Sequence, residues 1–215
     1  MNTSDNFLQT RQQFIIKISA HTVKGDVQNL NKYFNEALDS GVSINDIKET
    51  LVHIHAYAGF PASILALNTF KQVVEDRVKG DKIDFQGRDN SPITSTEGLY
   101  ERGEKVQILV TGMSAETLKE ITSFAPAIDE YLKEHLFGDL FDRDILTFAD
   151  REIITVTVLA ALHHPFVKSH ITGALNVGVT IEELNLIFNI IEEEIGSKES
   201  NTGRKILEEI VEALK

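Results

Sequence analysis

Residues 49–70 have the sequence ETLVHIHAYAGFPASILALNTF, and their pattern predicts the end of one helix, a hinge and the start of a second helix. Gly59 can adopt the left-handed conformation that ends many helices, and Pro61 suits the first turn of a new helix. Apolar residues repeat at helical spacing before the hinge, at Ile47, Leu51, Ile54 and Ala58. The stretch therefore predicts a helical hairpin around which the rest of the chain is organised.

A row of polar residues runs beside this apolar stripe. Because successive residues of a helix are rotated by about 100°, Glu49, His53 and Tyr57 fall on one line, whereas His55 lies on the opposite flank. A carboxylate, an imidazole and a phenol on successive turns can act as an acid–base row. The alternative is an ordinary helical hairpin whose half-buried His–Tyr pair satisfies its own hydrogen bonds.

The composition is that of a globular protein, because 42% of the 215 residues are hydrophobic and 25% are charged. This length allows one sizeable domain or two small ones. The formal net charge of −12 argues against nucleic acid or an anionic membrane as a partner. The first residues contain no apolar signal region, and no apolar run is expected to cross a bilayer, so we expect a cytoplasmic protein.

Cysteine is absent from the sequence. This absence excludes disulfides, zinc–thiolate sites and any redox cycle that depends on a thiol of the chain.

Helical spacing of the apolar residues, together with only four prolines, predicts an all-α fold. Ser43, Ser114 and Asp150 are expected N-caps, and Thr180 with Glu183 matches a capping box. The predicted helices cover residues 7–24, 27–39, 44–58, 61–78, 116–124, 126–138, 151–163, 165–177, 181–195 and 202–214.

The chain contains an internal repeat. Residues 36–54, EALDSGVSINDIKETLVHI, align without a gap with residues 173–191, GALNVGVTIEELNLIFNII. Two capped helices can resemble one another by chance, but the agreement of caps, glycines and apolar spacing favours a duplication.

The repeat gives the expected organisation of the chain. We expect a first repeat in residues 1–79, a linker or surface loop in residues 80–98 and a second repeat in residues 99–215, packed as one compact domain. Residues 80–98 lack periodicity and contain three glycines. Residues 99–112 have a mixed pattern that does not define an element.

The polar residues are not repeated. The row Glu49, His53 and Tyr57 occurs only in the first copy, and His163 and His170 occur only in the second. Each copy alone therefore contains only part of the candidate catalytic residues. We expect the two sets to face one pocket, either within a subunit or across an interface.

Two stretches resemble the carboxymuconolactone decarboxylase family: the pattern E-x3-H-x3-Y-x-G-x-P of the hinge, and residues 150–184, DREIITVTVLAALHHPFVKSHITGALNVGVTIEEL. Residues 99–112 and 124–152 also resemble the lead-in to that family's central motif. The resemblance implies an alkylhydroperoxidase-like helical fold made of two related helical-hairpin repeats. It also implies a homo-oligomer, a dimer, trimer or hexamer.

The same superfamily includes alkylhydroperoxidases, whose site is a glutamate followed by Cys-x-x-Cys-x3-His. When the motif is aligned on His170, His163 and Phe166 stand in place of the cysteines, and Glu152 lies near the position of the glutamate. Peroxide reduction by that route needs an attacking thiolate and a second, resolving thiol. The chain has neither, so thiol peroxidase chemistry is excluded.

Spacing limits what the residues of the second copy can do. Glu152 and His163 lie on one helix face but are separated by three turns, about 16 Å, so they cannot touch within a straight helix. His163 and His170 flank the turn at Pro165 and can approach each other, although each can equally be a packed, hydrogen-bonded histidine. No His-x3-His pair occurs, so we expect neither a bound metal nor another cofactor.

The family resemblance and the acid–base row together predict a cofactor-free decarboxylase or related lyase that acts on a small carboxylated lactone. Loss of carbon dioxide leaves an enolate, which the enzyme must stabilise and protonate. The expected roles are proton donor for His53, orientation of that histidine for Glu49, hydrogen-bond donation for Tyr57, enolate stabilisation for His170, and binding of the substrate carboxylate for Arg102 or Arg151. The alternative is a non-catalytic oligomeric protein that kept the fold and lost the chemistry.

Overall fold

The computed structural model describes residues 8–213, which form ten α-helices and one π-helix and contain no β-strand. The all-α, alkylhydroperoxidase-like fold that the sequence predicted is confirmed. Phe7 and Leu214, which the predicted first and last helices include, lie outside the described residues. The elements are α1 (Thr10–Lys24), α2 (Val27–Asp39), α3 (Ile44–Lys79), α4 (Leu99–Thr111), α5 (Ala115–Thr122), α6 (Pro126–Glu130), the π-helix η1 (Tyr131–Leu140), α7 (Phe148–Ala161), α8 (Val167–Asn176), α9 (Ile181–Glu194) and α10 (Ser197–Ala213).

The hinge predicted within residues 49–70 lies inside α3. Gly59 has φ 79° and ψ 161°, a backbone conformation that only glycine adopts without strain, and the helix bends there. Pro61 follows in the first turn of the second half, where its missing N–H costs no hydrogen bond. The hydroxyl of Ser63 donates to the carbonyl of Leu51 at 2.7 Å and ties the two halves together.

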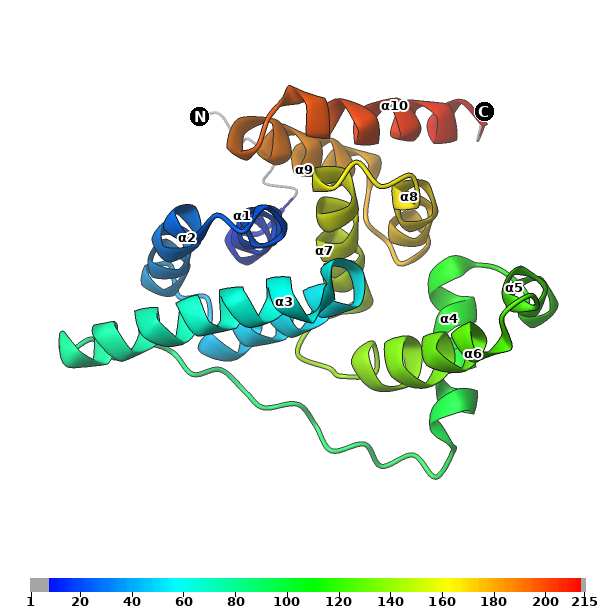
Figure 1. Cartoon of the computed structure of the whole chain (residues 1–215), viewed down its shortest axis with the longest axis horizontal. Helices are drawn as coiled ribbons and strands as arrows, with labels where there is room; N and C mark the ends of the chain where they lie inside the picture. The colour runs from blue at the N-terminus through cyan, green and yellow to red at the C-terminus, as the bar shows by residue number, and fades with distance from the viewer. Residues whose placement is uncertain (1–7, 214–215) are drawn as a thin grey trace, which may run out of the picture.

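Helix α7 is the central element of the fold. It lies between α1 and α8, with α3 on one side and α9 and α10 on the other (Figure 1). Every residue from Asp150 to Ala161 is buried. Ile154 and Val158 pack into a core with α1, α2 and α3, whereas Ile153 and Val156 pack into a second core with α8, α9 and α10. The two cores therefore share α7, and its polar residues lie in the interior.

The order of helices supports the predicted repeat. Helices α1, α2 and the two halves of α3 correspond in order to α7, α8, α9 and α10. Ser43 caps α3 by accepting from the amide of Asp46, and Thr180 caps α9 in the same way through Glu183. The duplication itself, with its boundaries at residues 1–79, 80–98 and 99–215, stays a prediction.

Three local expectations were wrong. The mixed stretch 99–112 forms the regular helix α4. Residues 126–138 do not form one α-helix, because α6 passes into the π-helix η1. Asp150 is not the cap of α7: Thr147 caps this helix, and Asp150 accepts from the Thr147 amide in a reciprocal capping box.

The expectation that no stretch is long and apolar enough to cross a membrane was also wrong. By length and composition alone, α3 qualifies, with a mean hydropathy of 1.3 over its most apolar 18-residue window. The first half of α3 nevertheless buries Ile47, Leu51 and Ile54 in the core with α1, α2 and α7. The apolar character of this half is thus explained by packing inside the fold.

Candidate functional site

Arg151 lies at the centre of a buried polar network between α7 and α3. Its side chain is fully buried, with 0% of its surface exposed. Nη1 donates to Nδ1 of His53 at 3.1 Å, and Nη2 donates to Glu49 Oε1 at 3.2 Å and to the carbonyl of Arg143 at 2.6 Å. Because Arg151 and Glu49 are both buried, each charge depends on the other for compensation.

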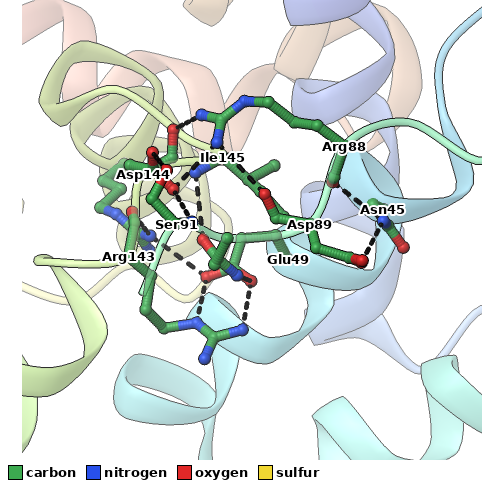
Figure 2. A network of polar contacts seen from close by, with 10 residues as sticks. Asn45, Glu49, Arg88, Asp89, Ser91, Arg143, Asp144 and Ile145 are labelled. Carbon is green, nitrogen blue, oxygen red and sulfur yellow. Dashed lines mark hydrogen bonds and ion pairs between the residues drawn. The ribbon is translucent and has the colours of Figure 1, made fainter. Parts of the chain in front are cut away.

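Glu49 is held at the outer end of this network by a second arginine. Arg143 binds its carboxylate with two hydrogen bonds of 2.7 and 2.8 Å (Figure 2). The side-chain amide of Asn90 also donates to this carboxylate, at 3.2 Å. Burial raises the pKa of Glu49, but the hydrogen bonds and charges of Arg143 and Arg151 outweigh it, so the pKa lies below its ordinary value. Glu49 is therefore ionised at neutral pH.

His53 is fully buried, and both of its ring nitrogens are occupied. Since an arginine N–H can only donate, Nδ1 accepts, and the ring proton must lie on Nε2. Nε2 donates to the hydroxyl of Thr155 at 3.2 Å, and that hydroxyl donates to the carbonyl of Arg151 at 2.8 Å. Burial, followed by the positive charge of Arg151, holds the pKa of His53 well below its ordinary range. His53 is therefore a neutral imidazole.

The ring of Tyr57 joins this network to a second one. Its centroid lies 5.5 Å from that of His53 and 5.2 Å from that of His170, which it meets edge to face at 89°. Burial, with the negative charge of Glu152, raises the pKa of Tyr57 and keeps the phenol protonated. His53 of the first predicted repeat and His170 of the second thus flank one tyrosine.

The second network pairs His170 on α8 with Glu152 on α7. Nδ1 of His170 lies 2.9 Å from Glu152 Oε2. Glu152 is fully buried, whereas 14% of the His170 side chain is exposed. Gly173 makes the close approach possible, because a Cβ at this position would lie 3.1 Å from Glu152 Oε2. The pair therefore has a buried carboxylate and an imidazole that reaches the surface.

Three buried polar atoms around these networks have no hydrogen-bond partner within residues 8–213. They are the Tyr57 hydroxyl, Glu152 Oε1 and Arg151 Nε. Buried polar groups are nearly always paired, because an unpaired one costs roughly 1–3 kcal/mol. The three atoms belong to side chains of the two networks that meet at Tyr57.

Two residues expected at the site lie elsewhere. His163, which has a φ of 54°, places its Nε2 3.4 Å from Glu199 Oε1 on α10 instead of approaching His170. Arg102 binds Asp142 at 3.0 Å and the carbonyls of Glu97 and Gly138, so it fastens α4 to η1. Neither joins the cluster around Tyr57.

One expected contact was also wrong. Glu49 does not orient His53 directly, because the guanidinium of Arg151 lies between them. The spacing along α3 correctly placed Glu49 and His53 on one face, but the guanidinium that hydrogen-bonds to both belongs to Arg151 on α7. The residue spacing within α3 cannot reveal a partner on another helix.

Three residues of the network were not predicted. Thr155 follows Arg151 by one helical turn, so helical spacing on α7 carried a signal for it. Arg143 and Asn90 lie outside the helices and reach Glu49 from the chain before α7 and from the long loop after α3. No periodic pattern identifies residues of this kind.

No group of three or more potential metal ligands occurs among residues 8–213. The cluster is instead built from two carboxylates, two histidines, two arginines and a phenol. Such a set can hold an anion or a polar carbonyl compound and can transfer a proton, because it combines fixed donors with an imidazole that is paired to a carboxylate.

Comparison with known proteins finds one family that a segment of the chain matches. Residues 126–209, which span α6 to most of α10, match the model of the carboxymuconolactone decarboxylase family. No curated protein matches the chain. The matched segment contains Arg151, Glu152 and His170, whereas Glu49, His53 and Tyr57 lie before it. This segment is therefore similar to the carboxymuconolactone decarboxylase family, and the chain around it contains no cysteine.

Proposed function

We propose that Glu152, His170 and Tyr57 form a cofactor-free acid–base site that removes carbon dioxide from a small carboxylated lactone. The observation that carries this proposal is the set of unpartnered buried atoms beside the His170–Glu152 pair: the Tyr57 hydroxyl, Glu152 Oε1 and Arg151 Nε. A substrate with a carboxylate and a ring carbonyl has the acceptors that the two free donors require.

In this reaction the bond between the ring carbon and the carboxylate breaks, and its electron pair moves onto the carbonyl oxygen to give an enolate. The phenol of Tyr57, kept protonated by its raised pKa, donates a hydrogen bond to that oxygen. Protonated His170 then delivers the proton of Nε2 to the carbon that lost the carboxylate, and solvent returns the proton to the ring.

Glu152 acts as the positioning residue for His170. Its carboxylate accepts from Nδ1 and so leaves Nε2 as the atom that transfers the proton. The free N–H of Arg151 is the donor suited to the substrate carboxylate before it leaves. Glu49 and His53 hold Arg151 in place, which differs from the role of proton donor expected for His53.

The test is release of carbon dioxide by the purified full chain from carboxymuconolactone and related small carboxylated lactones. We expect His170→Asn and Tyr57→Phe each to lower kcat about 100-fold, the usual loss for a proton-transfer group or an oxyanion donor. The control is His164→Asn, since His164 is exposed. Equal activity of His170→Asn and the wild type contradicts the assignment of the site.

The second candidate is a non-catalytic oligomeric protein. Large apolar side chains on the surface favour it, among them Phe60, Phe124 and Phe166. This function takes the lead if the wild type is folded and oligomeric but releases no carbon dioxide from any lactone of the set.

A further inference from the structure

A surface hollow of about 480 Å³ lies in the segment that α4, α5, α6 and η1 form. Figure 1 shows α4, α5 and α6 together at one side of the molecule, apart from α1 and α2. All four helices of the segment contribute to the lining, through Tyr100 of α4, Lys119 of α5, Asp129 of α6 and Glu134 of η1. No residue of the proposed acid–base site lines it, so the hollow is separate from that site.

The inner wall of the hollow, formed by Tyr100, Thr122 and Asp129, is held together by its own hydrogen bonds. Lys133, which is 1% exposed, donates to Asp129 at 3.0 Å and to the Tyr100 hydroxyl at 2.9 Å. Asp129 also accepts from the hydroxyls of Tyr100, at 2.6 Å, and Thr122, at 3.0 Å. Both carboxylate oxygens and both hydroxyls therefore have partners within the chain. This wall offers no unpaired group to a small polar ligand, which favours an apolar side chain as the occupant.

A large apolar side chain projects at the edge of the hollow. Phe124 is 100% exposed and lies in the chain between Ser123 and Pro126, which both line the hollow. Three further large apolar side chains of the segment expose 49–64% of their surface: Ile121, Ile128 and Tyr131. Exposed apolar side chains gathered in this way mark a surface that another molecule covers. The segment thus has both a projecting aromatic ring and a hollow that can receive one.

The rim of the hollow carries charges of both signs. Lys119 of α5 contributes a positive charge, and Glu130 of α6 and Glu134 of η1 contribute two negative charges. None of these three side chains forms an ion pair with another residue between positions 8 and 213. Their charges are therefore available to groups of opposite sign on a partner.

A surface that binds a copy of itself about a two-fold axis must be self-complementary, because each contact between the two chains then occurs twice. The ring beside the hollow and the two signs of charge on its rim meet this condition. We propose that this face binds the same face of a second copy of the chain. Phe124 of each chain fills the hollow of the other, and Lys119 of each chain lies beside Glu130 and Glu134 of the other.

The proposed contact assigns different effects to the ring and to the charges. Phe124 is the expected hot spot, because it is an aromatic side chain that becomes buried in a pocket at the centre of the contact. The charge pairs at the rim select the partner and its orientation more than they add affinity. An unrelated partner would have to supply all these features, whereas a second copy already has them.

Charge reversal tests both the surface and its two-fold geometry. Lys119→Glu and Glu130→Lys/Glu134→Lys should each raise the dissociation constant of the contact at least about tenfold, because each brings like charges together at two symmetric positions. Sedimentation at micromolar concentration and about 0.15 M salt should show the mass of each variant shifted toward half that of the wild type. An equimolar mixture of the two variants should recover the wild-type mass, because both rim contacts of a mixed pair again join opposite charges.

Phe124→Ala should raise the same dissociation constant about 100-fold, as loss of a hot spot does on both sides of a two-fold axis. Lys198→Glu, an exposed charge reversal on α10, is the matched control and should keep the wild-type mass. The proposal is overturned if the wild type sediments as a monomer, if the reversed variants keep its mass, or if their mixture does not recover it. If one charge variant fails to fold, as its melting curve shows, the other charge variant and Phe124→Ala decide the outcome.

Discussion

Arg151 donates from Nη1 to Nδ1 of His53 across 3.1 Å, so a cation of α7 lies against an imidazole of α3 with no water between them. The contact fixes the ring proton of His53 on Nε2 and disfavours protonation of Nδ1, which would give a charged imidazolium. An arginine held this way is a fixed positive charge inside the fold, and it depends on Glu49 for its balance.

The first prediction concerns this charge balance. Replacement Arg151→Met should lower the free energy of unfolding by about 3–5 kcal/mol, because it leaves Glu49 buried with one of its two arginines missing and His53 without its donor. Urea denaturation measures the loss. Arg204→Met is the matched control: Arg204 pairs with Glu192 at the surface, and its removal should cost at most about 1 kcal/mol. Equal losses would contradict a central role for Arg151.

The second prediction is the pH dependence of stability. The folded-state pKa of His53 lies well below the ordinary value of 6.5. Below pH 6.5, therefore, His53 is protonated in the unfolded chain but stays neutral in the folded chain. Stability from this group is complete above pH 6.5 and is lost as the pH falls, by up to about 1.4 kcal/mol per pH unit. The lowered pKa of Glu49 adds a further loss below its ordinary value of 4.5.

Urea denaturation between pH 7.5 and pH 5 tests this sign. His53→Gln should be less stable than the wild type at pH 7.5 and should show a shallower loss of stability down to pH 5. Parallel curves for the two proteins would show that His53 does not titrate in this range. His164→Gln, which removes an exposed histidine, should follow the wild-type curve.

The sequence was sufficient for those parts of the fold that local patterns encode. The hinge at Gly59 and Pro61 and the cap at Thr180 each rest on a few neighbouring residues whose backbone preferences suffice. It was insufficient for η1, because a π-helix differs from an α-helix in bonding residue i to i+5 and not to i+4, and ten residues are too few to reveal the small change in apolar period. The cap of α7 was missed because Thr147 and Asp150 can both cap, and spacing does not rank them.

The site was predictable only where its residues share a helix. Glu49, His53 and Tyr57 were aligned by the geometry of α3, but the partner of each comes from elsewhere: Arg143 for Glu49, Arg151 for His53 and His170 for Tyr57. Such contacts are set by how α3, α7 and α8 pack. The hydrogen bond between His55 and His135 could not be predicted for the same reason, because it depends on how α3 and η1 pack.

The third prediction is that the chain does not reduce organic hydroperoxides. It has no cysteine to form the attacking thiolate or the resolving thiol, although residues 126–209 match the carboxymuconolactone decarboxylase family. Consumption of an organic hydroperoxide, with a dithiol as reductant and a metal chelator present, should not exceed that of buffer. Turnover above this background would contradict the thiol requirement on which the exclusion rests.

The fourth prediction is a homo-oligomer in solution. Phe124 is fully exposed, and Phe60 and Phe166 expose more than half of their surface, an arrangement that costs free energy unless another subunit covers them. Sedimentation at micromolar concentration should give a mass of at least two chains. Phe124→Asp and Phe166→Asp should shift the distribution toward the monomer, whereas Lys168→Asp, an exposed charge reversal on α8, should not. A strict wild-type monomer would contradict the prediction.

The fifth prediction separates stability from function at Tyr57. Its buried hydroxyl has no partner within residues 8–213, so Tyr57→Phe removes an unsatisfied group and should leave the free energy of unfolding unchanged or raise it by up to about 1 kcal/mol. Tyr33→Phe is the matched control, because the buried Tyr33 hydroxyl is hydrogen-bonded to Glu194 and its loss should cost about 2 kcal/mol. Urea denaturation of both variants measures the contrast. If Tyr57→Phe destabilises as much as Tyr33→Phe, the Tyr57 hydroxyl has a structural partner, and the argument that it is kept for a substrate fails.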